Sequence, residues 1–332
     1  MSLDQSPSKP YDRLAFALSD DLAQVNALIQ LRMASEHAPR IPEVTAHLVN
    51  AGGKRLRPML TLAAAKMCGY AGPYHVHLAA TVEFIHTATL LHDDVVDEST
   101  QRRGRPTANL LWDNQSSVLV GDYLFSRAFQ LMVETKNLQV LDILANASAT
   151  IAEGEVLQLS AAKNLATTEE VYFKVIRGKT AALFAAAMEV GAVIADQDDK
   201  IVQALYDYGD ALGISFQIVD DLLDYTGTKA TGKSIGNDFR EHKLTLPLIK
   251  ALKVSDNNEL IFWKKCIVKG KQKASDLDHA LEIMHRHNTL DETRTQALFW
   301  ANKAKAALAV IPEHELKRML IDLSDYVVAR IN

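Results

Sequence analysis

The sequence has little of what disulfide-rich or membrane-spanning proteins need. Only two of its 332 residues are cysteines, Cys68 and Cys266, and they lie far apart without Cys-x-x-Cys spacing. A disulfide framework and a thiolate metal site are therefore excluded, and a reducing cytoplasm fits. The most apolar later stretch, residues 180–195, is too short to span a bilayer and includes Glu189.

The net charge and the composition of the N-terminal residues further limit the functions and locations that we expect for the protein. The net charge of -5 gives no support to nucleic-acid binding. Residues 1–10 are polar, contain proline and lack the apolar run of a signal peptide, so we expect a disordered tail there and a cytoplasmic protein.

Glycine and proline are sparse, at 15 and 9 residues, and alternating β-strand patterns are missing. Alanine and leucine recur at helical spacing instead, which predicts an all-α fold. A capping signal at 167–170 predicts a long helix over 171–195. Breaks fall at 52–53, 69–73 and 227–236, but no linker or repeat is evident, so we expect a single all-helical domain over 11–332.

A first cluster of acids stands in the segment LLHDDVVD, residues 90–97. On a helix, Asp93 and Asp97 share one face at about 5–6 Å between Cβ atoms, with Asp94 beside them. Hard oxygen ligands of this kind suit magnesium. One such cluster alone is weak evidence for a metal site, because acids four residues apart usually form a solvated helix face.

A second cluster repeats the pattern in QIVDDLLD, residues 217–224, with Asp220, Asp221 and Asp224. Both clusters are flanked by apolar residues, and acids embedded in a core need partners. Two such clusters facing each other would form a clamp for magnesium and a diphosphate.

Basic residues accompany both clusters. The segment GGKRLRP brings three cations to a glycine pair at 52–53, and others follow the first cluster or surround the second. Any one of them could be ordinary surface charge. Together they match two diphosphates, one held through metal and one held by cations alone. These cations include Lys54, Arg57, Arg102, Arg103, Lys179, Lys233 and Lys243.

These segments together resemble the trans-isoprenyl diphosphate synthase family over roughly residues 41–249. The motifs, in the order of the family, are GGKRLRP, HTATLLHDDVVDESTQRRGRPT, GDYLFSRAF, IAEGEVLQL, GKTAALF, FQIVDDLLDYTG and GKSIGNDFREHKLTLPLI. In the residues of these motifs, the sequence is most similar to bacterial octaprenyl, nonaprenyl and decaprenyl diphosphate synthases. The resemblance implies an isoprenoid synthase fold, a bundle of about ten or more helices around a deep central cavity, and a homodimer.

The implied reaction joins isopentenyl diphosphate head to tail to an allylic diphosphate such as farnesyl diphosphate. The implied product is a long all-trans chain, octaprenyl to decaprenyl, for the ubiquinone side chain. A shorter-chain synthase, making geranylgeranyl or farnesyl diphosphate, is the alternative. We also expect transient membrane contact for release of the product.

The resemblance assigns the metal ligands by position. It implies about three Mg²⁺ per active site, with Mn²⁺ as a substitute. Two ions would be held by Asp93, Asp94 and Asp97, the third by Asp220, Asp221 and Asp224, and a metal-bound water by Asp238.

It assigns the substrate contacts in the same way. The allylic diphosphate would meet Arg102, Lys179, Lys233 and Lys243. The diphosphate of isopentenyl diphosphate would meet Lys54, Arg57, His86 and Arg103. Thr180 and Gln217 would lie beside the developing carbocation. The loop GTKATG, residues 227–232, is about one residue shorter than usual in the family, which bears on Lys233.

Product length depends on the helix below the first cluster. Thr89 and Ile85 lie about one and two turns before Asp93, and Ala88 adjoins Thr89. In the family, a bulky residue at 88 or 89 closes the tunnel early. Here both are small, which predicts a deep tunnel and a long product.

Three rival classes use similar parts. Helical di-iron proteins carry Glu-x-x-His pairs, and this chain has Glu83-x-x-His86 and Glu282-x-x-His285, but that hypothesis leaves both aspartate clusters unexplained. A terpene cyclase or head-to-head synthase needs no separate cationic site. A regulatory subunit would be expected to have lost one acid cluster.

Overall fold

The structure is a computed structural model that describes residues 9–50, 52–227 and 235–331. The predicted tail, residues 1–10, lies outside the described part up to residue 8, and the first helix begins at Pro10. Lys233 and most of the break at 227–236 also lie outside it.

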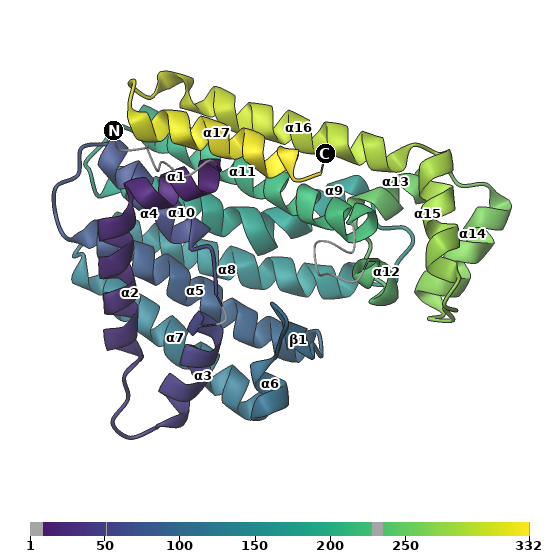
Figure 1. Ribbon diagram of the computed structural model, residues 1–332, viewed down its shortest axis with the longest axis horizontal. Coiled ribbons are helices and arrows are strands. Elements are labelled where there is room, and N and C mark those ends of the chain that lie inside the picture. The colour runs from purple at the N-terminus through teal and green to yellow at the C-terminus, as the bar shows by residue number, and fades with distance from the viewer. Residues whose placement is uncertain (1–8, 51, 228–234, 332) are drawn as a thin grey trace, which may run out of the picture. The chain divides into compact units, whose positions relative to one another are not determined.

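Helices dominate the described residues, which confirms the predicted all-α class (Figure 1). The α-helices are α1 (Pro10–Ala17), α2 (Ser19–Met33), α3 (Arg40–Asn50), α4 (Leu56–Met67), α5 (Tyr74–Val96), α6 (Ala108–Leu111), α7 (Asn114–Glu134), α8 (Leu138–Ala161), α9 (Glu169–Ile176), α10 (Ala182–Val193), α11 (Asp199–Thr226), α12 (Asn237–Arg240), α13 (Leu246–Val254), α14 (Asn257–Trp263), α15 (Asp276–Arg286), α16 (Thr289–Ala307) and α17 (Glu315–Ala329). Shorter pieces are the π-helices η1 (Arg177–Ala181) and η3 (Lys264–Val268), the 3₁₀-helix η4 (Leu308–Val310), and the strands β1 (Gln101–Arg102) and β2 (Arg105–Pro106).

The chain divides into two compact units. Residues 1–148, 186–206 and 313–317 form the first unit, and residues 149–185, 207–312 and 318–332 form the second. The single domain over 11–332 stays a prediction.

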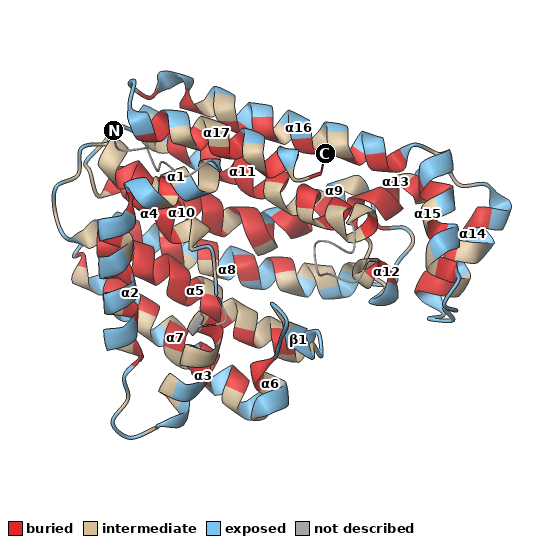
Figure 2. Cartoon of the chain, in the orientation of Figure 1, coloured by how far each residue is buried: buried red, intermediate tan, exposed pale blue. Residues whose placement is uncertain are grey.

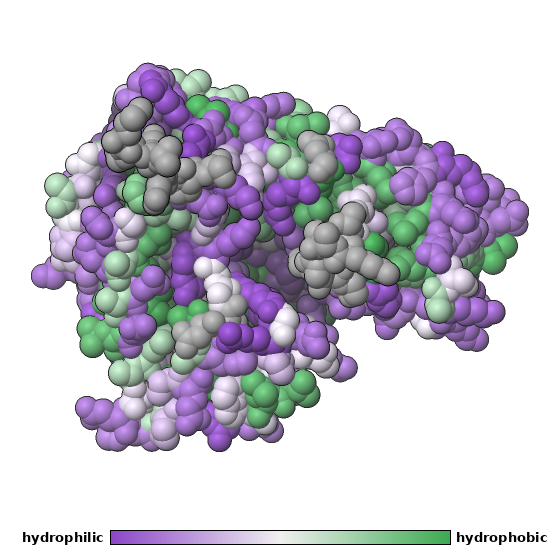
Figure 3. Space-filling model, in the orientation of Figure 1, coloured by the Kyte–Doolittle hydropathy of each residue, from purple (hydrophilic) through white to green (hydrophobic). Residues whose placement is uncertain are grey.

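In the first unit, α5 packs against α7, α4 and α2. Its apolar residues from Val76 to Leu91 are mostly buried, as are those of α4 (Figure 2). The helix α7 has two faces: Val120, Leu124 and Leu131 are buried, whereas Leu119 is exposed. Green atoms gather over α6 in Figure 3, where Leu110 and Leu111 are exposed.

In the second unit, hydrogen bonds between buried groups tie α11 to the C-terminal helices. Tyr208 Oη donates to the carbonyl of Leu320 at 2.8 Å, and Ser215 Oγ donates to that of Ala297 at 3.0 Å. The α11 segment of this unit is therefore fixed by both α16 and the second-unit part of α17.

The predicted helix over 171–195 is present, but its middle is π-helical. Thr168 is the N-cap and accepts from the amide of Val171, while η1 separates α9 from α10. Insertions of this kind are frequent at functional sites.

A short hairpin was not predicted. The strands β1 and β2 pair antiparallel, with Arg102 opposite Arg105. The turn residues Arg103 and Gly104 have φ of 52° and 73°, as a type I′ turn requires. The hairpin thereby fixes the backbone of both predicted arginines.

Candidate active site

The first acid cluster lies at the C-terminal end of α5. Asp93 is half-buried, Asp94 is fully buried, and Asp97 is the exposed C-cap residue. The structure thus gives the three carboxylates of one motif three different environments.

Asp94 is held by an arginine fork. Arg102 Nε donates to Asp94 Oδ1 and Oδ2 at 2.9 and 3.1 Å, and Arg102 Nη2 donates to Oδ1 at 2.7 Å. Bidentate pairs of this kind are strong and geometrically specific. Two residues predicted to meet metal and diphosphate separately therefore meet each other here.

Four arginines lie near α5, the helix that carries the first acid cluster. We call Arg55, Arg57, Arg102 and Arg103 the arginine cluster. Arg55 is the left-handed N-cap residue of α4, with φ of 50°. Arg103 donates to the carbonyl of Gly52. A Cβ at Gly53 would lie 3.0 Å from an Arg103 nitrogen, so glycine there allows the guanidinium to approach the backbone closely.

Lys54 lies at the edge of this cluster and is exposed. Its Nζ stands 5.4 Å from the ring centroid of Tyr11, and the Tyr11 hydroxyl donates to the Lys54 carbonyl. The α1 residue Tyr11 was not among the predicted site residues.

Glu83 and His86 face the arginine cluster from α5. Glu83 is buried and pairs with Arg55, and Arg57 Nη1 approaches His86 Nε2 at 3.2 Å. Burial, reinforced by the neighbouring arginines, lowers the pKa of His86 well below its usual value. A neutral imidazole can then accept the Arg57 hydrogen bond.

Burial also shifts the pKa values of the charged groups in this cluster. It lowers the pKa of Arg57 to about 10, and it raises the pKa of Glu83 against the opposing effect of Arg55, Arg57 and Arg103. Arg55 and Glu83 were missed as site residues. The signal for Arg55 was its place in GGKRLRP, and the signal for Glu83 was its three-residue spacing from His86 on one helix.

The second acid cluster lies near the end of α11. Asp221 is buried, and its two oxygens accept from Tyr172 Oη at 2.6 Å and from Gln217 Nε2 at 2.7 Å. Thr180 Oγ1 donates to Gln217 Oε1 at 2.8 Å. The structure thus joins the predicted residues Thr180, Gln217 and Asp221 in one chain of hydrogen bonds.

Asp224 binds the short helix α12. Its oxygens accept from the backbone amides of Asn237 and Asp238 at 3.1 and 2.9 Å. Burial raises the pKa of Asp221, Asp224 and Asp238; repulsion within this group adds to the rise at Asp221 and Asp238, and repulsion from Glu241 adds to it at Asp224. A bound cation would offset this repulsion.

Lys179 lies in η1 and contacts α8. Its Nζ donates to Glu155 at 2.8 Å and to Gln158 at 2.9 Å. Lys243 pairs with Glu241 at 2.8 Å. The structure leaves the predicted diphosphate contacts of both lysines as predictions.

Arg330, near the C-terminus, reaches the second cluster. Its guanidinium lies 3.7 Å from Asp220 and 5.4 Å from the ring centroid of Phe216. No sequence motif after residue 254 pointed to it.

The predicted chain-length residues all lie on α5. Ile85 and Ala88 are fully buried, and Thr89 is half-buried with its hydroxyl bonded to the His86 carbonyl at 2.9 Å. The tunnel and the central cavity stay predictions.

Among the described residues, no group of three or more His, Cys, Asp or Glu side chains is arranged as a ready metal site. Carboxylates such as Asp93, Asp97 and Asp220 still suit magnesium, which binds through one or two carboxylates plus substrate phosphates. No helix within 9–50, 52–227 and 235–331 is long and apolar enough to cross a membrane.

The di-iron hypothesis does not match the side chains. Glu83 and His86 contact arginines, while Glu282 is exposed and bonded to His279 at 3.2 Å.

A family comparison matches residues 38–284, more than half of the chain, to the polyprenyl synthetase model. The chain belongs to the polyprenyl synthetase family. It is a prenyltransferase, as the sequence predicted.

Similar proteins cover nearly the whole chain. An octaprenyl diphosphate synthase from Haemophilus influenzae is 41% identical over 96% of this chain and 97% of its own. A decaprenyl diphosphate synthase structure from Rhodobacter capsulatus is 68% identical, covers 97% of this chain and 100% of its own, and has a TM-score of 0.95.

A third relative is a polyprenyl synthase from Caulobacter crescentus, complexed with calcium and isoprenyl diphosphate. It is 49% identical, covers 99% of this chain and 100% of its own, and has a TM-score of 0.92.

Proposed function

We propose that this polyprenyl synthetase elongates an allylic diphosphate with isopentenyl diphosphate to an octaprenyl to decaprenyl product. The observation that carries the proposal is the presence of two aspartate clusters and a separate arginine cluster in a chain 68% identical to a decaprenyl diphosphate synthase. A cyclase has no need of the second, cationic site.

We propose that Mg²⁺, or Mn²⁺ in its place, is the metal, with about three ions per site. Of the predicted ligands, Asp93, Asp97 and Asp220 are half-exposed or exposed, so a metal ion can reach them, whereas Asp94 and Asp221 are buried. When bound, the metal supplies Lewis-acid stabilisation of the charge that develops on the departing diphosphate.

The chain's own residues bind and orient the substrates. Arg57 and Arg103 would hold the diphosphate of isopentenyl diphosphate through charge-assisted hydrogen bonds, with neutral His86 fixing Arg57. Thr180 and Gln217 would present their dipoles to the allylic cation. The C–O bond of the allylic diphosphate breaks, with diphosphate as the leaving group, and the double bond of isopentenyl diphosphate attacks the cation. The new chain then loses a proton to the departed diphosphate.

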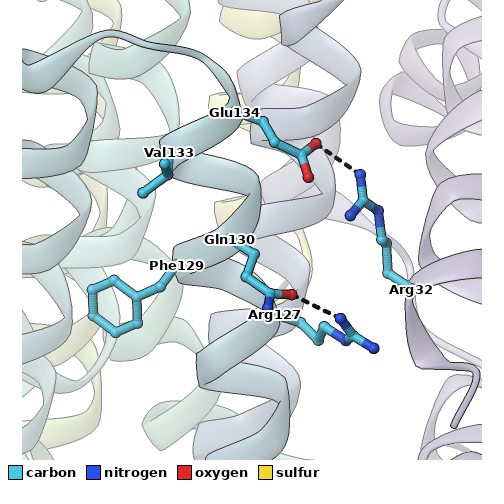
Figure 4. A pocket seen from close by; sticks show the side chains of 6 residues that line it. All are labelled: Arg32, Arg127, Phe129, Gln130, Val133 and Glu134. Carbon is cyan, nitrogen blue, oxygen red and sulfur yellow. Dashed lines mark hydrogen bonds and ion pairs between the residues drawn. The ribbon is translucent and has the colours of Figure 1, made fainter.

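We further propose a homodimer that uses the exposed apolar face of α7. Leu119, Phe129 and Val133 are 67%, 42% and 61% exposed. The last two line a groove of about 560 Å³ beside α2, shown in Figure 4. Cytoplasmic location, a role in making a ubiquinone side chain and membrane contact during product release are parts of the same proposal.

Substitution of one aspartate in each cluster tests the assignment. The Asp93→Ala and Asp220→Ala variants should each lose turnover by orders of magnitude and keep the wild-type circular dichroism spectrum. Matched controls are Asp20→Ala and Asp291→Ala, which remove exposed carboxylates from the first turns of α2 and α16. Near-normal turnover in either cluster variant would refute the metal assignment.

A further inference from the structure

Tyr172 is a buried tyrosine whose hydroxyl is bonded to the second acid cluster. It lies on α9 and is 3% exposed. Its hydroxyl donates to Asp221 Oδ2 at 2.6 Å, a short bond between two buried groups. A side chain so enclosed does not reach a substrate, but it can determine where Asp221 lies.

The chemistry of the groups fixes the direction of each bond in this chain. Gln217 Nε2 donates to Asp221 Oδ1 at 2.7 Å, so the amide nitrogen of Gln217 faces Asp221. The Gln217 carbonyl oxygen must then face Thr180, whose hydroxyl donates to it. The orientation of the Gln217 amide therefore depends on Asp221 staying in place.

Two helices bring these residues together. Tyr172 and Thr180 belong to α9 and η1, whereas Gln217 and Asp221 are one turn apart on α11. The crossing is close, because a Cβ at Gly213 would lie 2.6 Å from Ala181 Cα. The hydrogen-bond chain is thus anchored at both ends by packed backbone.

We propose that Tyr172 is a positioning residue for the condensation, holding Asp221 so that Asp221 orients Gln217 and, through it, Thr180. This inference rests on the proposed function. In it, Asp221 acts through Gln217, whose amide nitrogen donates to one Asp221 oxygen while Tyr172 holds the other. Loss of the Tyr172 hydroxyl would leave Asp221 one donor and a freer rotamer, and misplaced catalytic groups lose rate.

Steady-state kinetics of Tyr172→Phe, at saturating Mg²⁺ with farnesyl and isopentenyl diphosphates, test the proposal. We expect kcat to fall roughly 10- to 100-fold, while both KM values stay within about twofold of wild type. Tyr208→Phe is the matched control, because it removes another buried tyrosine hydroxyl, bonded to the Leu320 carbonyl, from the same unit. It should keep the wild-type kcat.

The outcomes separate the alternatives. An unchanged kcat in Tyr172→Phe, an equal fall in both variants, or a raised KM with kcat retained would each overturn the positioning role. A wild-type enzyme that forms no elongated product would overturn the proposed function itself, and this inference with it.

Discussion

At the scale of single residues, the arginine cluster shows how a cationic site is kept intact inside a protein. Four guanidinium groups repel one another, and buried Glu83 supplies the opposite charge through its pair with Arg55. His86, one turn along the same helix, stays neutral and adds no charge. Glu83 and Asp94 thus offset part of the positive charge, and the cluster keeps a net positive charge that favours an anion.

The neutral state of His86 makes stability depend on pH. Its pKa is depressed by burial and the arginines, so below about pH 6.5 the unfolded chain binds a proton that the folded chain does not. Stability due to this group is complete above that pH and is lost as the pH falls.

We expect the free energy of unfolding, measured by urea denaturation from pH 7 to 5, to fall less steeply for His86→Gln than for wild type. The difference should reach at most about 1.4 kcal/mol per pH unit. Equal slopes for the two proteins would show that His86 charges freely in the folded state.

Sequence spacing found the residues of the site better than it found their partners. Both aspartate clusters were predicted from the sequence, because acids four residues apart with apolar neighbours form an unusual pattern. The partners of Asp94, Asp221 and Asp220 were not identified as such, because Arg102, Tyr172 and Arg330 lie on other elements. Such pairings depend on tertiary packing, which carries no local signal.

At the scale of elements, η1 and α8 set the position of Lys179 and Thr180. Gly178 and Gly154 meet where the two segments cross: a Cβ on Gly154 would lie 2.7 Å from the Lys179 amide nitrogen. Gly178, unusual within a helix, is explained by this contact.

Gly154→Ala should displace η1 and with it Lys179 and Thr180. We expect a loss of about 1–3 kcal/mol in the free energy of unfolding, typical of overpacking, together with reduced turnover. The comparison is Ser160→Ala, an exposed change on the same helix, which should do neither. A Gly154→Ala protein with wild-type stability and turnover would mean that the helices separate without cost.

Helical periodicity predicted the helices themselves, because a buried stripe repeats every three to four residues. Periodicity missed the π-helical turn in 171–195 and the hairpin of β1 and β2. A five-residue turn and a pair of two-residue strands are both too short to show a repeating pattern of apolar residues. The predicted capping signal at 167–170 is confirmed, because Thr168 is the N-cap residue and accepts the amide hydrogen bond of Val171.

At the scale of the whole molecule, the predicted tunnel would set the length of the product. The predicted tunnel follows α5 past Ala88, whose small side chain is fully buried. Ala88→Phe should therefore give a shorter product, resolved by reversed-phase chromatography, whereas Ala88→Ser should leave the length unchanged. Identical products from both variants would place the end of the tunnel elsewhere.

The most direct test of the account is a product assay on the wild-type protein with Mg²⁺, farnesyl diphosphate and labelled isopentenyl diphosphate. The account predicts one dominant product between octaprenyl and decaprenyl diphosphate. A product that stops at geranylgeranyl diphosphate would contradict the deep tunnel but keep the reaction. No elongation at all would contradict the proposed function.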